Sequence, residues 1–241
     1  MGTDIHMWAE VRKSYPHIKD ESDRTKYEAE WQTVGRMFKN EYAKSDELIT
    51  ITGDGYSWGD VFTEHPYQQR NYNVFAMLAD VRNERGFAGV DTGDGFVPIA
   101  MPRGFPPDLS KFMRKKSEDV EHTPSWLSLD ELESYDWNQV TKHRGWVNPK
   151  EFKEFQERGK PSSWCGGVSG GLVSHVSNER MEQIADAAFD PENFYTYTQV
   201  EWESTYADSA GAFYTETLPR LREIRNLPNV TDLRIVFWFD S

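Results

Sequence analysis

The two ends of the chain constrain its fold more than any other feature, because both have the alternating pattern of a β-strand. Successive side chains of a strand point to opposite faces. The apolar members of the two alternations are Ile5, Met7, Ala9 and Val11, then Leu233, Ile235, Phe237 and Phe239. If both strands lie in one sheet, these faces cover a common core. The opposite face then gathers Asp4, His6, Trp8, Arg234, Trp238 and Asp240.

Between the termini, helix and strand patterns are mixed without regular alternation. Strands are expected over 27–35 and 194–202, and helices over 71–85, 128–135, 181–188 and 218–225. This mixture predicts an α+β fold with a mainly antiparallel sheet that includes both terminal strands, with helices packed on one face. We expect a single domain over residues 1–241, with long loop insertions near 39–67 and 142–160.

Composition argues against several classes of function. The formal net charge of −13 opposes sequence-independent binding to DNA or RNA, which requires clustered basic residues, and binding to an anionic membrane. No apolar run approaches the roughly 20 residues of a membrane span. Cys165 is the single cysteine, so an internal disulfide and a multi-cysteine zinc site are excluded. These features predict a cytosolic protein without membrane attachment.

The polar face of the first strand carries a candidate catalytic pair. Asp4 and His6 lie two residues apart, so the carboxylate could orient the imidazole for acid–base chemistry. Asp240 would join them from the last strand, beside Trp8 and Trp238. The same residues could ligate a divalent metal, but no complete metal motif is present, so the metal ligands stay unknown. The alternative interpretation is the polar outer face of an edge strand.

Three arginines are candidate anion ligands, because a guanidinium fork suits phosphate or carboxylate. They are Arg70, which is followed by Asn71, then Arg82 and Arg103. Each could equally form an ion pair at the surface of an acidic protein.

A loop further along the chain offers two more candidates. His122 could act as a general acid or base, and Ser125 could donate a hydrogen bond to a ligand. Ser125 lacks the Gly-x-Ser-x-Gly setting of a serine nucleophile. The alternative is a loop that is simply packed by Trp126, with His122 in solvent.

Several motifs together resemble a family of small proteins often encoded by bacteriophages and some bacterial genomes. They are the Asp4-Ile5-His6 strand, Arg70-Asn71-Tyr72, Pro102-Arg103-Gly104, Ser125-Trp126-Leu127 and the terminal Val236-Phe237-Trp238-Phe239-Asp240. The resemblance covers most of the chain. It implies a phage accessory protein that acts against host defence, and it implies no particular reaction.

The leading hypothesis is a phage-type counter-defence protein of the host cytosol that binds a small nucleotide-derived immune signal. The pocket would be lined by Asp4, His6, Arg70, Arg103, His122 and Asp240. His6 and His122 could move protons in phosphodiester cleavage, so both hydrolysis and sequestration stay open.

Two rival hypotheses come from other classes of protein. The acidic region 162–208 could mimic nucleic acid or inhibit a basic host protein, although a solvated acidic face explains the same composition. A phage structural or metabolic accessory protein is the other alternative. Homo-oligomerisation is also left open.

Overall fold

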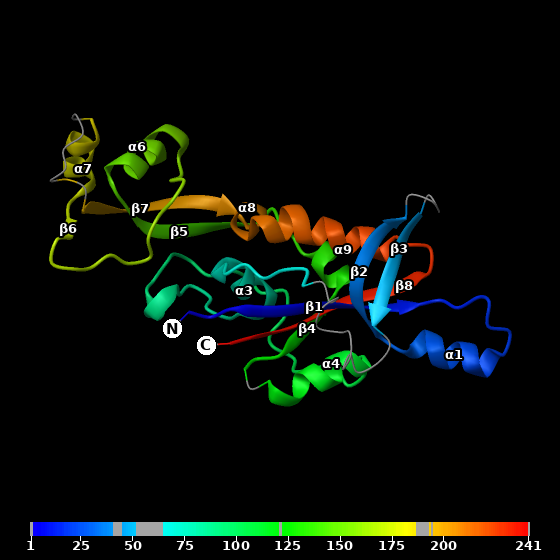
Figure 1. Cartoon of the computed structure of the whole chain (residues 1–241). Coiled ribbons are helices and arrows are strands. Elements are labelled where there is room, and N and C mark those ends of the chain that lie inside the picture. Colours follow the sequence, from blue (N-terminus) through cyan, green and yellow to red (C-terminus); the bar gives the residue numbers. More distant parts are fainter. Residues whose placement is uncertain are drawn as a thin grey trace.

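The computed structural model describes residues 2–40, 45–51, 65–120, 122–186, 193 and 195–240. Its largest sheet has five antiparallel strands in the order β3-β2-β1-β8-β4 (Figure 1). The strands are β1 (Ile5–Lys13), β2 (Gln32–Asn40), β3 (Ser45–Ile51), β4 (Ser125–Ser128) and β8 (Val230–Phe239). β1 and β8 pair from Ile5 opposite Phe239 to Val11 opposite Leu233. The predicted α+β fold, with both terminal strands in an antiparallel sheet, is confirmed.

The main core lies on the face of this sheet that carries the apolar alternation of β1 and β8. The helices are α1 (Glu21–Ala29), α3 (Tyr72–Ala79), α4 (Lys111–Lys116), α5 (Leu129–Ser134), α6 (Pro149–Arg158), α7 (Asn178–Ala185), α8 (Tyr206–Ala210) and α9 (Leu218–Arg225). Short 3-10 turns span Phe87–Gly89 and Ser117–Asp119, and a π-helical turn spans Phe213–Thr217. Helices α3, α5, α8 and α9 supply side chains to this core.

Helix α4 packs on the other face of the sheet, so helices cover both faces (Figure 1). Phe112 and Met113 are fully buried there against Trp8 and Val236. Two adjacent apolar residues in so short a helix produce no periodic pattern. The expectation of helices on one face therefore omitted this layer.

A second, three-stranded sheet has the order β5-β7-β6. Its strands are β5 (Val140–Val147), β6 (Ser174–His175) and β7 (Thr196–Thr205). With α6 and α7 it forms a smaller core around Phe152, Met181 and Trp202. The segment 142–160, expected as a loop insertion, is therefore mostly β5 and α6. Its polar side chains obscured the alternation of buried and partly exposed positions in β5.

Several predicted boundaries differ from the structure. The strand expected over 194–202 is β7 at Thr196–Thr205, and the helix expected over 181–188 is α7, which begins at Asn178; residues 187, 188 and 194 lie outside the described part of the chain. Helix α3 was expected to continue to residue 85 but ends at Asp80, whose backbone adopts the left-handed conformation with φ of 59°. The strand expected over 27–35 begins only at Gln32, because α1 occupies Glu21–Ala29. Helix α1 buries none of its side chains, so it has no apolar face to reveal it. The loop insertion expected near 39–67 falls partly outside the described residues, and β3 forms within it.

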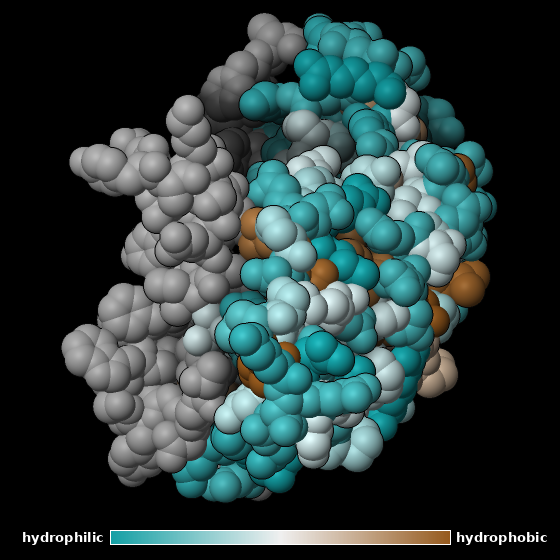
Figure 2. Space-filling view, turned by 90° about the vertical axis from the view of Figure 1, so that its right-hand side faces the viewer, coloured by the Kyte–Doolittle hydropathy of each residue, from teal (hydrophilic) through white to brown (hydrophobic). Residues whose placement is uncertain are grey.

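The side of the molecule that carries α1 presents a mainly hydrophilic surface with scattered apolar residues (Figure 2). Among the helices of the described ranges, none combines the length and apolar character needed to cross a membrane.

A buried ion pair joins β1 to β8. Arg234 Nε lies 2.7 Å from Glu10 Oε2, and the two side chains are 3% and 0% exposed. Arg234 Nη1 also donates to Asp108 Oδ1 at 2.7 Å. The backbone N–H of Ser110 donates to Glu10 Oε1 at 2.8 Å. Both carboxylate oxygens of Glu10 are thus hydrogen-bonded, as a buried charge requires.

We expect the stability of the fold to decrease as pH falls from 7 to 5, because burial lowers the pKa of His143. The unfolded chain takes up this proton near pH 6.5, whereas the folded protein resists it, so the free energy of unfolding is highest above that pH. The contribution of His143 should be on the order of 1–2 kcal/mol over this range. Urea unfolding midpoints at each pH measure it. His143→Gln is expected to flatten the dependence while retaining a donor for Ser209, and an unchanged slope would contradict this assignment.

Candidate functional site

The pairing of β1 with β8 brings the predicted catalytic residues together at one end of the sheet, where both chain ends lie (Figure 1). His6 Nε2 lies 2.8 Å from Asp240 Oδ2. The backbone N–H of Asp4 donates to Asp240 Oδ1 at 3.0 Å, and that of Asp240 donates to Asp4 O at 3.1 Å. We call Asp4, His6, Trp8, Arg70, Trp238 and Asp240 the terminal-strand cluster.

Aromatic rings form one side of the terminal-strand cluster. Trp8 and Trp238 stack with ring centres 4.5 Å apart, and the His6 ring stacks on Trp238 at 5.7 Å. Phe105 contacts Trp238 edge-on from the loop before α4. The His6 side chain is 40% exposed, so a ligand could reach the imidazole from solvent.

The carboxylates of this cluster are held in their ionised form. The hydrogen bond with Arg70 lowers the pKa of Asp4, and the hydrogen bond with His6 lowers the pKa of Asp240. Arg70 contacts both oxygens of Asp4, with Nε–Oδ1 and Nη2–Oδ2 distances of 2.7 and 2.5 Å. The ionised Asp240 carboxylate can accept a hydrogen bond from His6 Nε2 and so orient the imidazole for acid–base chemistry.

The other predicted anion ligands have partners within the protein. Both terminal nitrogens of Arg103 donate to Glu131, and the guanidinium lies over the Trp126 ring. Arg82 donates twice to Thr3 Oγ1, at 3.0 and 2.8 Å. Arg70, Arg82 and Arg103 therefore each donate hydrogen bonds to acceptors within the protein. The structure therefore does not arrange them around a common anion.

The remaining predicted residues have mainly structural contacts. Asn71 caps α3 and its side chain donates to Ser209 O at 2.9 Å. Ser125 is buried, and its hydroxyl accepts from the backbone N–H of Arg103 at 3.3 Å. His122 is exposed, and its carbonyl accepts from the N–H of Phe239 at 3.4 Å, next to Asp240. The backbone of His122 thus contacts β8 next to Asp240 of the terminal-strand cluster.

The described geometry gives little support to a metal site, or to an acidic region that mimics nucleic acid or inhibits a basic protein. Across the described residues, no group of three His, Cys, Asp or Glu side chains is arranged to hold a metal ion. In the acidic half, Glu201 pairs with Arg144 at 2.6 Å, and Asp208 pairs with Lys160 at 3.0 Å. These pairs neutralise part of the acidic surface.

Sequence reasoning missed a groove beside the N-terminal part of α4. It has a volume of about 630 Å³ and lies between the segment leading into α1, the start of β2 and the N-terminal part of α4. We call it the aromatic groove. Its lining includes Tyr15, His17, Tyr27, Glu30, Trp31, Gln32, Asp108, Lys111 and Arg114. Its volume is in the range of roughly 300–1,000 Å³ that is typical of small-molecule sites.

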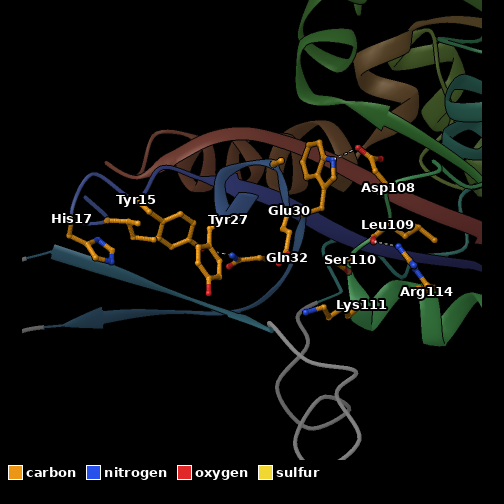
Figure 3. Close-up of a pocket in the computed structure, with 13 residues that line it drawn as sticks. Tyr15, His17, Tyr27, Glu30, Gln32, Asp108, Leu109, Ser110, Lys111 and Arg114 are labelled. Carbon is orange, nitrogen blue, oxygen red and sulfur yellow. Dashed lines mark hydrogen bonds between the residues drawn. The ribbon is translucent and has the colours of Figure 1, made fainter. Parts of the chain in front are cut away.

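The aromatic groove has different chemistry at its two ends. Figure 3 shows Tyr15, His17 and Tyr27 toward one end, and Lys111 and Arg114 toward the other. Within the described part of the chain, neither Lys111 nor Arg114 has a carboxylate partner, whereas the predicted arginines are already engaged. The groove thus combines exposed aromatic rings with cations available to a ligand.

Asp108 adds little negative charge to the free surface of this groove. Partial burial would raise its pKa, but hydrogen bonds from Arg234 and Trp31 and the charge of Arg12 bring the pKa below its ordinary value. The carboxylate is therefore ionised and already neutralised by arginine. Glu30 remains as the acidic side chain of the lining without such an arginine.

A sequence signal for the groove existed, because aromatic and basic residues interleave between Ser14 and Trp31. The second half of the groove comes from α4, about 80 residues further along the chain, and sequence alone gives no reason to join them.

No protein-family model, no curated protein and no solved structure matches this chain.

Proposed function

We propose that the protein binds a nucleotide-derived small molecule in the aromatic groove and sequesters it. The observation that carries this proposal is that one hollow of suitable size holds aromatic rings together with Lys111 and Arg114, which have no carboxylate partner among the described residues. Arg114 donates a 3.5 Å hydrogen bond to the backbone carbonyl of Leu109. Aromatic rings stack on nucleobases, and Lys and Arg neutralise phosphates. Tyr27, with 48% of its surface exposed, offers a ring face, while Lys111 and Arg114 offer the charges.

Local charge makes this proposal compatible with a net charge of −13. An acidic protein repels long nucleic acids, but a small anion responds to the few charges within a Debye length, about 8–10 Å. The resemblance to phage-encoded proteins supports a role in host infection, in which a sequestered nucleotide signal cannot reach its receptor.

We expect native mass spectrometry to detect retained nucleotide when the full chain is incubated with a panel of linear and cyclic nucleotides. Sequestration predicts one stoichiometric complex whose ligand is released with unchanged mass on denaturation. Nucleosides, which carry no phosphate, should be retained more weakly, because they have no anionic group to bind Lys111 and Arg114. If no member of the panel is retained at micromolar concentrations, the proposal is wrong.

Hydrolysis is the second candidate, and the 2.8 Å contact between His6 and Asp240 favours it. The pair could accept a proton from water attacking a phosphodiester, while the Trp238 ring holds a base. The same incubations test this activity through product masses, with and without EDTA to assess a metal. If the His6→Ala variant forms no product but still retains the nucleotide, then catalysis takes place at the terminal-strand cluster and binding takes place in the aromatic groove.

A further inference from the structure

A second hollow of about 380 Å³ adjoins the aromatic groove. The two share Trp31 and Asp108, whose side chains are joined by a 2.9 Å hydrogen bond from Trp31 Nε1 to Asp108 Oδ2. We call it the second compartment. The rest of its lining is Arg12, Pro106, Pro107, Trp126, Ser128, Asp232 and Arg234. A ligand longer than the groove would therefore continue into this compartment across the Trp31–Asp108 contact.

The charges of the second compartment are balanced. Arg12 lies 2.9 Å from Asp108 and 3.8 Å from Asp232. Arg234 is neutralised by Glu10 and Asp108. Such a hollow does not favour a free phosphate. Its prolines and tryptophans instead suit an uncharged planar group.

Arg12 adds a feature that a planar polar group could use. Its guanidinium lies 4.6 Å from the centre of the Trp31 ring, and its Nε is buried without a hydrogen-bond partner in the described structure. Guanidinium planes stack on nucleobases as aromatic rings do. A nucleobase in this compartment could therefore stack on the face of the Arg12 guanidinium that is turned away from Trp31.

The positions of the aromatic rings and the cations along the surface indicate which class of nucleotide fits both hollows. The tyrosines lie toward one end of the aromatic groove, and Lys111 and Arg114 lie toward the end where Asp108 is found (Figure 3). A ligand whose phosphates bind these cations could therefore reach the tyrosines on one side and the second compartment, across Trp31 and Asp108, on the other. Resting on the nucleotide binding proposed above, we infer that the ligand is a dinucleotide, with its phosphates at Lys111 and Arg114 and one base on each side.

The test compares affinities for the four 5′-phosphorylated homodinucleotides with those for the matching mononucleotides, by isothermal titration calorimetry on the full chain. The best dinucleotide is expected to bind at least about tenfold more tightly than its mononucleotide, because a second base stacks. Trp126→Leu should abolish this gain and leave mononucleotide affinity unchanged. Trp146→Leu, which removes a tryptophan of β5 outside both hollows, is the matched control and should retain the gain.

The outcomes separate this inference from the proposal on which it rests. Equal affinity for mononucleotide and dinucleotide in the unaltered protein would overturn the dinucleotide inference and leave nucleotide binding in place. Binding of neither would overturn the proposed function itself. Should Trp126→Leu fail to fold, Arg12→Gln provides the second variant. It is expected to reduce dinucleotide affinity selectively, and an unreduced gain in that variant would again contradict the inference.

Discussion

Replacing Arg234 with methionine is expected to lower the free energy of unfolding by about 3–5 kcal/mol. After the substitution, the fully buried carboxylate of Glu10 keeps the hydrogen bond from the backbone N–H of Ser110 but loses the guanidinium that neutralises it. It also removes an arginine that contacts Asp108 and lies 4.0 Å from the centre of the Trp31 ring. An uncompensated charge in the interior must either be desolvated or take up a proton, and both are costly. Urea unfolding followed by circular dichroism measures the effect.

Two controls identify burial as the cause. Arg70→Met breaks the contact with Asp4, but Arg70 is 51% exposed and solvent screens such a pair, so the loss of stability should be much smaller than for Arg234→Met. The double variant Glu10→Leu with Arg234→Met removes both charges and should be more stable than Arg234→Met alone. If Arg234→Met costs no more than Arg70→Met, then water reaches the pair and the interior assignment is wrong.

Reversing both groove cations, with Lys111→Glu and Arg114→Glu together, is expected to weaken nucleotide binding on the order of 100-fold or more. Each charge-assisted hydrogen bond to a phosphate is worth about 1.5–3 kcal/mol, and reversal adds repulsion. Both side chains are exposed, so the fold should be unaffected. Titration calorimetry with the ligand found by native mass spectrometry measures the change in affinity.

The matched control reverses two cations outside the groove, with Lys142→Glu and Lys160→Glu. Lys160 and Lys142 belong to the small-sheet part of the molecule, where they contact Asp208 and Glu201. This variant has the same net charge as the groove variant, so it corrects for long-range repulsion. Equal losses in both variants would show that total charge, and not the groove, governs binding.

The face on which Asp4, His6 and Asp240 lie was predictable because strand periodicity depends only on local backbone geometry, whereas their convergence required the pairing of β1 with β8. Alternation assigned these residues to one face before any pairing was known. The helix expected to begin at residue 128 also depends on a local pattern, the Ser-x-x-Glu spacing of Ser128 and Glu131, and both hydrogen bonds of that capping box are present. The predicted arginines were less informative, because a guanidinium binds whichever carboxylate the tertiary structure brings near it.

Along the polar face of the sheet, the burial of individual side chains could not be predicted from the local sequence pattern. Arg234 was expected in the same polar set as His6, yet Asp108 and Trp31 contact Arg234, which is buried, whereas His6 is half exposed. Nothing in the alternation of β8 distinguishes the two ends of that face. The difference comes from contacts with segments more than 100 residues before β8.

The sequence by itself determined the fold class, the pairing faces of the terminal strands and the exclusion of a disulfide framework. Each of these follows from composition or from periodicity within a few residues. Only the tertiary structure decided which side chains line the aromatic groove, which arginines are engaged, and that the face opposite the main core is itself covered by a helix. Those properties depend on contacts between segments far apart in the chain, and the hydrophobic and electrostatic free energies that select such contacts leave no local pattern.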